Sequence, residues 1–233
     1  MQSALRLIFI LQLALGIAAP MAAIGQQEPE FPIPPDLGFL RLINATGHPG
    51  KLWVTVNGVK LAAASGYEDG TVTGAMGIQN KSLAIEMRHD TLGEVKQAVT
   101  LKVGVITTVI AVPAPKKADA KAVKPEEEGK LELAVHLLEL PASRPDAPST
   151  LTLIQFTPAT VLTAAVASTT LSLPMAKPQT MTVTREMGGF LEVTLQGKII
   201  AQLNFKDPAG QGVVIYTDTG GVVKSSQFRN DVQ

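Results

Sequence analysis

Two stretches of the sequence recur at a single spacing, and this internal repeat constrains the fold more than any other feature. Leu-Arg-Leu-Ile at residues 40–43 returns as Leu-Thr-Leu-Ile at residues 151–154, an offset of 111 residues. At the same offset, residues 71–77 return as residues 182–188, and both segments read Thr-Val-Thr-x-x-Met-Gly. Because self-similarity at a fixed period indicates repeated structural units, we predict two copies of one small domain.

Each copy is expected to close with a strand that begins at a glycine and is rich in β-branched residues, at residues 104–112 and 210–217. The second copy is about five residues shorter between its second motif and this strand, which indicates a shortened hairpin loop.

Within each copy the pattern is that of short strands and tight turns. Asn57-Gly58 lies between alternating segments and predicts a hairpin, because a type I′ turn needs positive φ at both central residues. Turns are also expected at residues 90–93 and 196–197, and residues 161–167 are interpreted as strand rather than helix. With about six or seven strands in each copy, the predicted fold class is all-β: two tandem small antiparallel β-sandwich domains, Ig-like or jelly-roll-like.

The first 25 residues read as a secretory signal peptide. Arg6 precedes an apolar run over residues 7–18, which Pro20 ends, and small residues then lead to a cleavage site after Gly25. The run is shorter than the roughly 20 residues that cross a bilayer as a helix, although an uncleaved anchor is the alternative. We therefore expect a periplasmic or extracellular protein with no transmembrane segment in its mature chain.

The expected domain organisation follows from these features. Residues 26–36 form a Pro-rich leader, residues 37–145 the first β-sandwich domain and residues 146–233 the second. Residues 113–130 are rich in Pro, Ala, Lys and Glu and are predicted to form a disordered insertion in the first domain. After it, residues 131–137 alternate like a strand that could pair back onto that domain.

Composition excludes several classes of function. The chain has no cysteine, so disulfides, thiolate metal sites and thiol nucleophiles are absent. The formal net charge is zero, which gives no electrostatic reason to expect binding to nucleic acid or to an anionic membrane surface.

No residue pattern predicts a catalytic, cofactor-binding or metal site. The histidines do not stand at ligand spacing, and His89 is expected to be solvated in a turn, while His136 is expected at an edge or surface. Ser65 and the pair Ser225-Ser226 have turn-like polar neighbours and no partnered histidine, and Glu68-Asp69 reads as a solvated turn. We therefore expect no enzyme activity and no cofactor.

Other candidate motifs carry weak signals. Residues 74–77 and Gly220-Gly221 are not phosphate loops, because neither is followed by Lys-Ser/Thr and a helix. Asn44 and Asn80 begin glycosylation sequons, which matter only in a eukaryotic source. Trp53 is the single tryptophan, and core or subunit packing is favoured over a sugar-stacking platform.

The order of segments resembles the AlgF family of periplasmic accessory proteins of alginate O-acetylation. The resemblance lies in the strand at residues 39–45, in Leu-x-Glu-x-Pro at residues 137–141 and in the strand at residues 210–216 before a Thr/Gly turn. It implies two β-sandwich domains and a non-catalytic adaptor that meets the polysaccharide indirectly. The implied partners are a periplasmic acetyltransferase or other envelope proteins. The longer insertion at residues 113–130 departs from the family pattern.

Two readings of function remain open on these grounds. The first is a periplasmic or extracellular adaptor in O-acetylation of an alginate-like exopolysaccharide. The alternative is a cell-surface structural or adhesion module built on the same fold, since a fold alone does not decide function.

Overall fold

A computed structural model describes residues 36–61, 65–79, 81–116, 130–142, 150–159, 161–166, 169–182, 189–205 and 210–230. The signal peptide expected at residues 1–25 and the leader up to residue 35 therefore lie outside the described residues. No helix among the described residues is long and apolar enough to cross a membrane.

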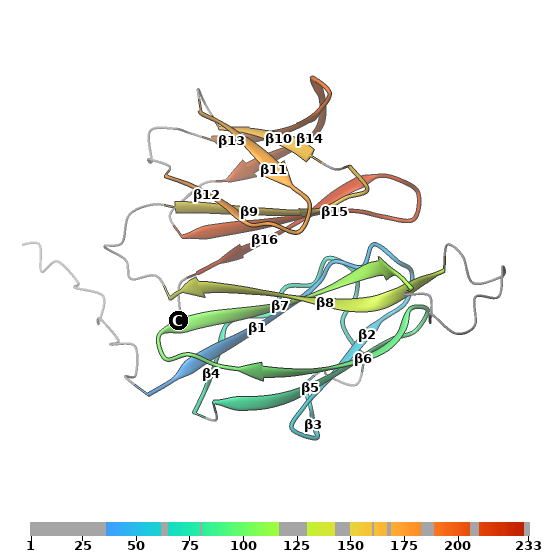
Figure 1. Cartoon of the computed structure of the whole chain (residues 1–233), viewed down its shortest axis with the longest axis vertical. Coiled ribbons are helices and arrows are strands. Elements are labelled where there is room, and N and C mark those ends of the chain that lie inside the picture. The colour runs from blue at the N-terminus through green and yellow to red at the C-terminus, as the bar shows by residue number, and fades with distance from the viewer. Residues whose placement is uncertain are drawn as a thin grey trace, which may run out of the picture. The chain divides into compact units, whose positions relative to one another are not determined.

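The described residues form sixteen strands, eight in each copy, and their order can be followed in Figure 1. The first copy contains β1 (Gly38–Asn44), β2 (Leu52–Val56), β3 (Val59–Lys60), β4 (Met76–Ile78), β5 (Ser82–His89), β6 (Gly93–Thr100), β7 (Val105–Pro115) and β8 (Leu131–Pro141). The second copy contains β9 (Thr150–Phe156), β10 (Val161–Val166), β11 (Thr169–Pro174), β12 (Gln179–Thr182), β13 (Gly189–Leu195), β14 (Lys198–Phe205), β15 (Gln211–Thr217) and β16 (Val223–Arg229).

The two copies have the same topology. In the first copy the sheets have the orders β4-β1-β7-β8 and β3-β2-β5-β6. In the second they have the orders β12-β9-β15-β16 and β11-β10-β13-β14, so every strand has a counterpart eight places later. The predicted all-β fold with two tandem sandwiches is confirmed, with eight strands in each copy instead of six or seven.

The sheets differ from the prediction in one pairing. Among the described strands, the neighbouring pairs are antiparallel except β1 with β7 and β9 with β15, which are parallel. This pairing arises because the glycine-led strand returns beside the first strand of its copy. That strand does not close the copy, because β8 and β16 follow it and pair with it; the expected return of residues 131–137 is thus confirmed.

The register corrects half of the repeat alignment. Leu40 lies opposite Met76, and its counterpart Leu151 lies opposite Met181. The structural partner of Met76 is thus Met181 and not Met187, which lies outside the described residues. The sequence comparison matched Met76 with Met187 because both segments contain Thr and Met at the same spacing. Strand pairing, which defines structural equivalence, places the counterpart six residues earlier, at Met181.

The insertion also begins later than predicted. Strand β7 continues through Pro115, and Pro113 lies opposite Leu133 of β8. Residues 117–129 of the expected insertion lie outside the described residues. The predicted hairpin turns are confirmed, since Asn57 and Gly58 have φ values of 49° and 80° and Gln196 and Gly197 have values of 51° and 80°.

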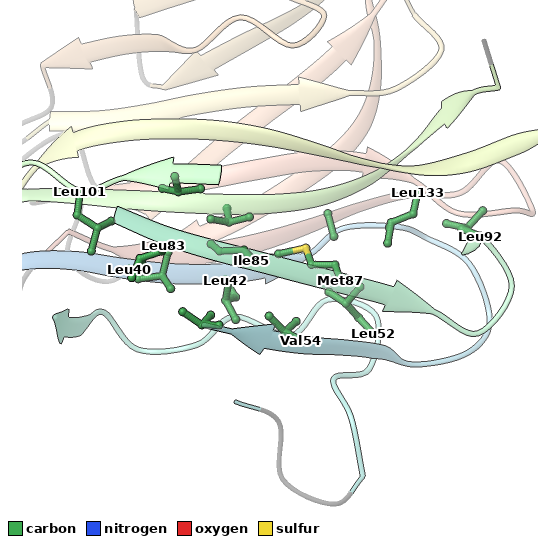
Figure 2. Close-up of a cluster of buried hydrophobic side chains, with 14 residues drawn as sticks. Leu40, Leu42, Leu52, Val54, Leu83, Ile85, Met87, Leu92, Leu101 and Leu133 are labelled. Carbon is green, nitrogen blue, oxygen red and sulfur yellow. The ribbon is translucent and has the colours of Figure 1, made fainter. Parts of the chain in front are cut away.

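Each sandwich has its own core between its two sheets. Figure 2 shows the first, in which Leu40 and Leu42 of β1 lie among Val54 of β2 and Ile85 and Met87 of β5. An equivalent cluster in the second copy is built on Leu151, Leu153, Leu162, Leu191, Val193 and Val213. Alternation explains both, because every second residue of a strand faces the same side.

A third buried cluster joins the two copies. It contains Ile43, Ile110 and Leu138 from the first copy and Ile154, Val214, Tyr216 and Phe228 from the second. The two sheets that contain β1 and β9 are therefore covered on both faces, and we call them the inner sheets. This is why β1 is buried at every position, whereas β2 and β5 of the outer sheet alternate.

Candidate functional site

Polar contacts surround the apolar junction between the copies. The Asp69 carboxylate accepts a hydrogen bond from the Gly47 N–H at 2.9 Å and pairs with the Lys224 ammonium at 3.0 Å. The Thr219 N–H donates to the Gly47 carbonyl at 3.1 Å. The interpretation of Glu68-Asp69 as a solvated turn is therefore wrong for Asp69, which links the first copy to β16 of the second.

The pair Ser225-Ser226 lies in strand β16 and not in a turn. Ser226 is buried, and its hydroxyl donates to the Gly70 carbonyl at 3.2 Å across the junction. Beside it, burial raises the pKa of the Tyr216 hydroxyl, and the Asp69 carboxylate raises it further. Ser226 therefore holds the two copies together and is not an accessible nucleophile. Ser65 is exposed in a turn.

Arg41 is the residue that sequence reasoning missed. It lies in the middle of β1 with a side chain only 2% exposed, and its guanidinium lies 4.8 Å from the centre of the Phe228 ring. Its Nη1 donates to Asn230 Oδ1 at 3.2 Å, and its Nη2 donates to the Arg229 carbonyl. The repeat contained a signal for Arg41. In the otherwise apolar motif Leu-x-Leu-Ile, the first copy has an arginine at the position where the second copy has Thr152.

A cleft of about 580 Å³ borders Arg41 at the junction. Its lining comes from Val72, Thr73, Gly74 and Ala75 of the first copy and from Gln211, Gln227, Phe228 and Arg229 of the second. A buried guanidinium needs oxygen acceptors to offset its desolvation, and Asn230 and the Arg229 carbonyl of the second copy supply two of them. Arg41 therefore links the middle of β1 to the end of β16 in the second copy.

A second cleft of about 540 Å³ lies on the outer sheet of the first copy, over β2, β5 and β6. Trp53 stands there, half-buried, and its indole N–H donates to Asp90 Oδ1 at 3.0 Å. The Arg88 guanidinium lies 5.8 Å from the ring centre on the β5 side, and a Cβ at Gly66 would lie 3.2 Å from the ring on the other. Trp53 is therefore held between neighbours on the outer face, not in the core.

The outer sheets of the two copies differ in charge. On the first, Glu86 pairs with Lys96 at 2.9 Å, and Arg88 lies opposite Glu94 in the register. The matching rows of the second copy carry Thr163, Ala165, Ser172, Thr194 and Ile199, with Glu192 hydrogen-bonded to Gln202. The same fold thus presents a charged face in one copy and a largely uncharged face in the other.

His89 lies in β5 and His136 in β8. Burial lowers the pKa of His89, and His48 is near enough to His89 for its charge to lower that pKa further. His89 is buried, which corrects the expected solvated turn, and the Thr91 N–H donates to its Nδ1 at 3.2 Å. An acceptor Nδ1 places the proton on Nε2, which lies 3.4 Å from the Thr46 hydroxyl. His136 lies on the edge strand β8, as expected, and packs edge-on against Phe156 of the second copy with ring centres 5.2 Å apart.

The remaining motifs have structural roles. Residues 76–77 belong to β4, and at Gly220 the N–H donates to Asp218 Oδ1 at 2.9 Å, so a carboxylate occupies that turn. Asn44 is buried with its amide bonded to the Tyr67 carbonyl, so its sequon is not accessible. Asn80 lies outside the described residues.

The described part of the chain holds no group of three or more His, Asp or Glu side chains that could bind a metal ion. Comparison with known protein families and with curated protein sequences finds no match to this chain. The candidate sites are therefore surfaces: the junction with its cleft, the two outer faces and the strand edges.

Proposed function

We propose that the chain is a non-catalytic adaptor of the periplasm or cell exterior that assists O-acetylation of a secreted, alginate-like exopolysaccharide. In this role it binds a periplasmic acetyltransferase or other envelope proteins, meets the polysaccharide only through them and needs no cofactor. The proposal rests on the leader-like N-terminus, on the resemblance described above and on the following property of the fold.

The observation that carries the proposal is the shared cluster between the inner sheets. Nine buried side chains from both copies form it, and Arg41 and Asp69 add polar links across the junction. Packing of this kind resists independent movement of the two sandwiches. Each copy therefore offers its own outer sheet at a fixed position relative to the other.

The contrast between the outer sheets supports two different partners. A charged face steers a partner of complementary charge, whereas a largely uncharged face with several threonines favours contacts by shape and apolar area. The resemblance to the AlgF family rests on segments that become β1, the end of β8 and β15, which are parts of the inner sheets. The outer faces lie outside these segments, so the resemblance does not specify their residues, and we assign the choice of partner to them.

A matched pair of double charge reversals tests the proposal. Lys60→Glu with Lys96→Glu changes the charged face, and Lys177→Glu with Lys198→Glu changes exposed lysines of the second copy. We expect the first variant to lose co-purification with the acetyltransferase and to lower the acetyl content of the polysaccharide. The second should retain both, with circular dichroism confirming that each variant folds.

Two results would contradict the adaptor role. One is acetyl transfer or acetyl-ester hydrolysis by the purified chain alone. The other is an unchanged acetyl content of the polysaccharide in cells that lack the chain.

A further inference from the structure

The two copies end in equivalent edge strands that differ in chemistry. Val109 lies opposite Leu137 of β8, and the equivalent Val213 lies opposite Gln227 of β16. By this register, the β16 segment Ser-Ser-Gln-Phe-Arg at residues 225–229 corresponds to Val-His-Leu-Leu-Glu at residues 135–139 of β8. Charged side chains such as lysine and arginine on an edge protect it from pairing with another strand, whereas a long apolar edge invites pairing.

The outward backbone groups of β8 can be assigned from one hydrogen bond. The Leu133 N–H donates to the Leu92 carbonyl at 2.9 Å, away from β7. Because backbone groups alternate in direction along a strand, those of Val135, Leu137 and Glu139 also point away from β7. No described residue pairs with the edge between Val135 and Glu139.

The strand itself is firmly anchored. Leu133 lies in the core of the first copy, and Leu138 lies in the cluster between the copies. We call the unpaired part of the edge, from Val135 to Glu139, the open window. Leu137 lies at its centre and remains 37% exposed. The window is thus a rigid, preformed row of donors and acceptors with an apolar side chain at its centre.

We propose that a second copy of the chain adds its own β8 to this edge, in an antiparallel pair with Leu137 on the two-fold axis. In such a pair, residues whose backbone groups point outward lie opposite one another. The Leu133 N–H is already bonded to Leu92, so the outward residues left to pair are Val135, Leu137 and Glu139. A pair that uses all three is centred on Leu137. Val135 then lies opposite Glu139 of the other copy, and the two Leu137 side chains cover each other. No glutamate lies opposite a glutamate, so the register is self-complementary.

A dimer of this kind joins the two inner sheets of the first copies into one continuous eight-stranded sheet across the axis. The outer faces assigned to partners above remain uncovered. The inference goes beyond the adaptor role, and either can fail while the other stands, because the oligomeric state is measured without any partner protein.

The absence of cysteine from the chain makes single-cysteine cross-linking a direct test. In the proposed pair, the Cα atoms of the two residues 137 lie about 5.5 Å apart, within the range of about 4.4–6.8 Å that a disulfide spans. The two residues 139 are offset by four positions and lie about 13 Å apart or more. Leu137→Cys, Glu139→Cys and, as the matched position of the second copy, Gln227→Cys are compared in the full chain after mild oxidation.

We expect a disulfide-linked dimer for Leu137→Cys, formed at least about tenfold faster than for Glu139→Cys or Gln227→Cys. Cross-linking of Leu137→Cys at the rate of the two other variants would overturn the proposal, as would faster cross-linking at residue 139.

Sedimentation of the cysteine-free chain gives a second measurement. Leu137→Lys places two ammonium groups opposite each other on the axis, and their repulsion should weaken the dimer. We expect its dissociation constant to rise at least about tenfold. Gln227→Lys should leave it unchanged. A monomer at every concentration of the unsubstituted chain would also overturn the proposal.

Discussion

At the scale of single residues, the hydrogen bonding of buried polar side chains decides how a substitution changes the stability of this protein. In the described part of the chain, the hydroxyls of Thr107 and Thr108 on β7 are buried without a hydrogen-bond partner. Thr152 is also buried, but its hydroxyl lies 3.2 Å from the Thr180 hydroxyl. An unpaired hydroxyl costs free energy on burial, whereas a paired one contributes to stability.

Replacing a hydroxyl by a methyl group should therefore have opposite effects at these sites. We expect Thr107→Val to raise the free energy of unfolding by about 1 kcal/mol and Thr152→Val to lower it by about 1 kcal/mol. Chemical denaturation of both variants measures the difference. Equal destabilisation by the two changes would show that the Thr107 hydroxyl has a partner.

His89 gives the fold a dependence on pH. Burial lowers the pKa of His89, although the neighbouring Asp90 carboxylate acts in the opposite direction. The unfolded chain takes up a proton near pH 6.5, and the folded chain takes it up only at lower pH. The free energy of unfolding should therefore fall as the pH drops below about 6.5, and level off once the lowered pKa is passed.

Burial lowers the pKa of His136 as well, so both histidines contribute with the same sign. His89→Asn and His136→Asn should each flatten the fall in stability between about pH 7 and pH 5, whatever they do to stability at neutral pH. Denaturation curves across this range provide the check. Variants that both keep the original slope would rule out the assigned cause.

At this scale the sequence identified few of the residues that matter. Core or subunit packing was expected for Trp53, but it lies on the outer face between Arg88 of β5 and Gly66, which lies in the segment between β3 and β4. Asp69 and Ser226 looked like surface residues because their neighbours in sequence are polar. Their partners lie in the other copy, and contacts between residues 155 and 156 positions apart leave no local pattern.

At the scale of elements, the close approach of loops at the junction depends on Gly47. Its φ is +61°, and a Cβ there would lie 2.4 Å from the Thr217 carbonyl of the second copy. Gly58 has a φ of +80°, and a Cβ there would meet nothing within 4 Å. Both glycines thus have the positive φ that disfavours other residues, but only at Gly47 would a Cβ clash with a neighbouring atom.

Gly47→Ala should therefore destabilise the chain more than Gly58→Ala. The strain of positive φ costs about 1 kcal/mol in both, and the clash should add about 1–3 kcal/mol at Gly47 alone. Thermal and denaturant unfolding of the two variants measure this excess. An excess near zero would mean that the junction can open at this loop without cost.

Strands and hairpins were the most predictable part of the fold. Alternation and the Asn57-Gly58 turn are local signals, and β2, β5, β6 and β10 follow them closely. The parallel pairing of β1 with β7 was not predicted, because no local signal specifies which distant strand is the neighbour. Pairing with β9 likewise sets the register of β12, and the sequence of its motif did not reveal that register.

At the scale of the whole molecule, the two sandwiches form one body. Burial of β1 on both faces was not predicted, because Gly-Phe-Leu-Arg-Leu-Ile-Asn was interpreted only as a strand of one domain. The second face is covered by a copy that begins more than 100 residues later, and sequence alone could not say which surface would cover it. The fixed placement of two unlike outer faces, on which the proposed adaptor role rests, depends on this junction.

Unfolding of a single variant tests the junction most directly. Trp53, the only tryptophan, reports on the first copy, whereas Leu191 lies in the core of the second. Leu191→Ala should cost about 2–5 kcal/mol. If the copies unfold together, the Trp53 fluorescence transition should move to lower denaturant by the same amount as the circular dichroism of the whole chain. A Trp53 transition that stays in place while the second copy unfolds earlier would contradict a single rigid body.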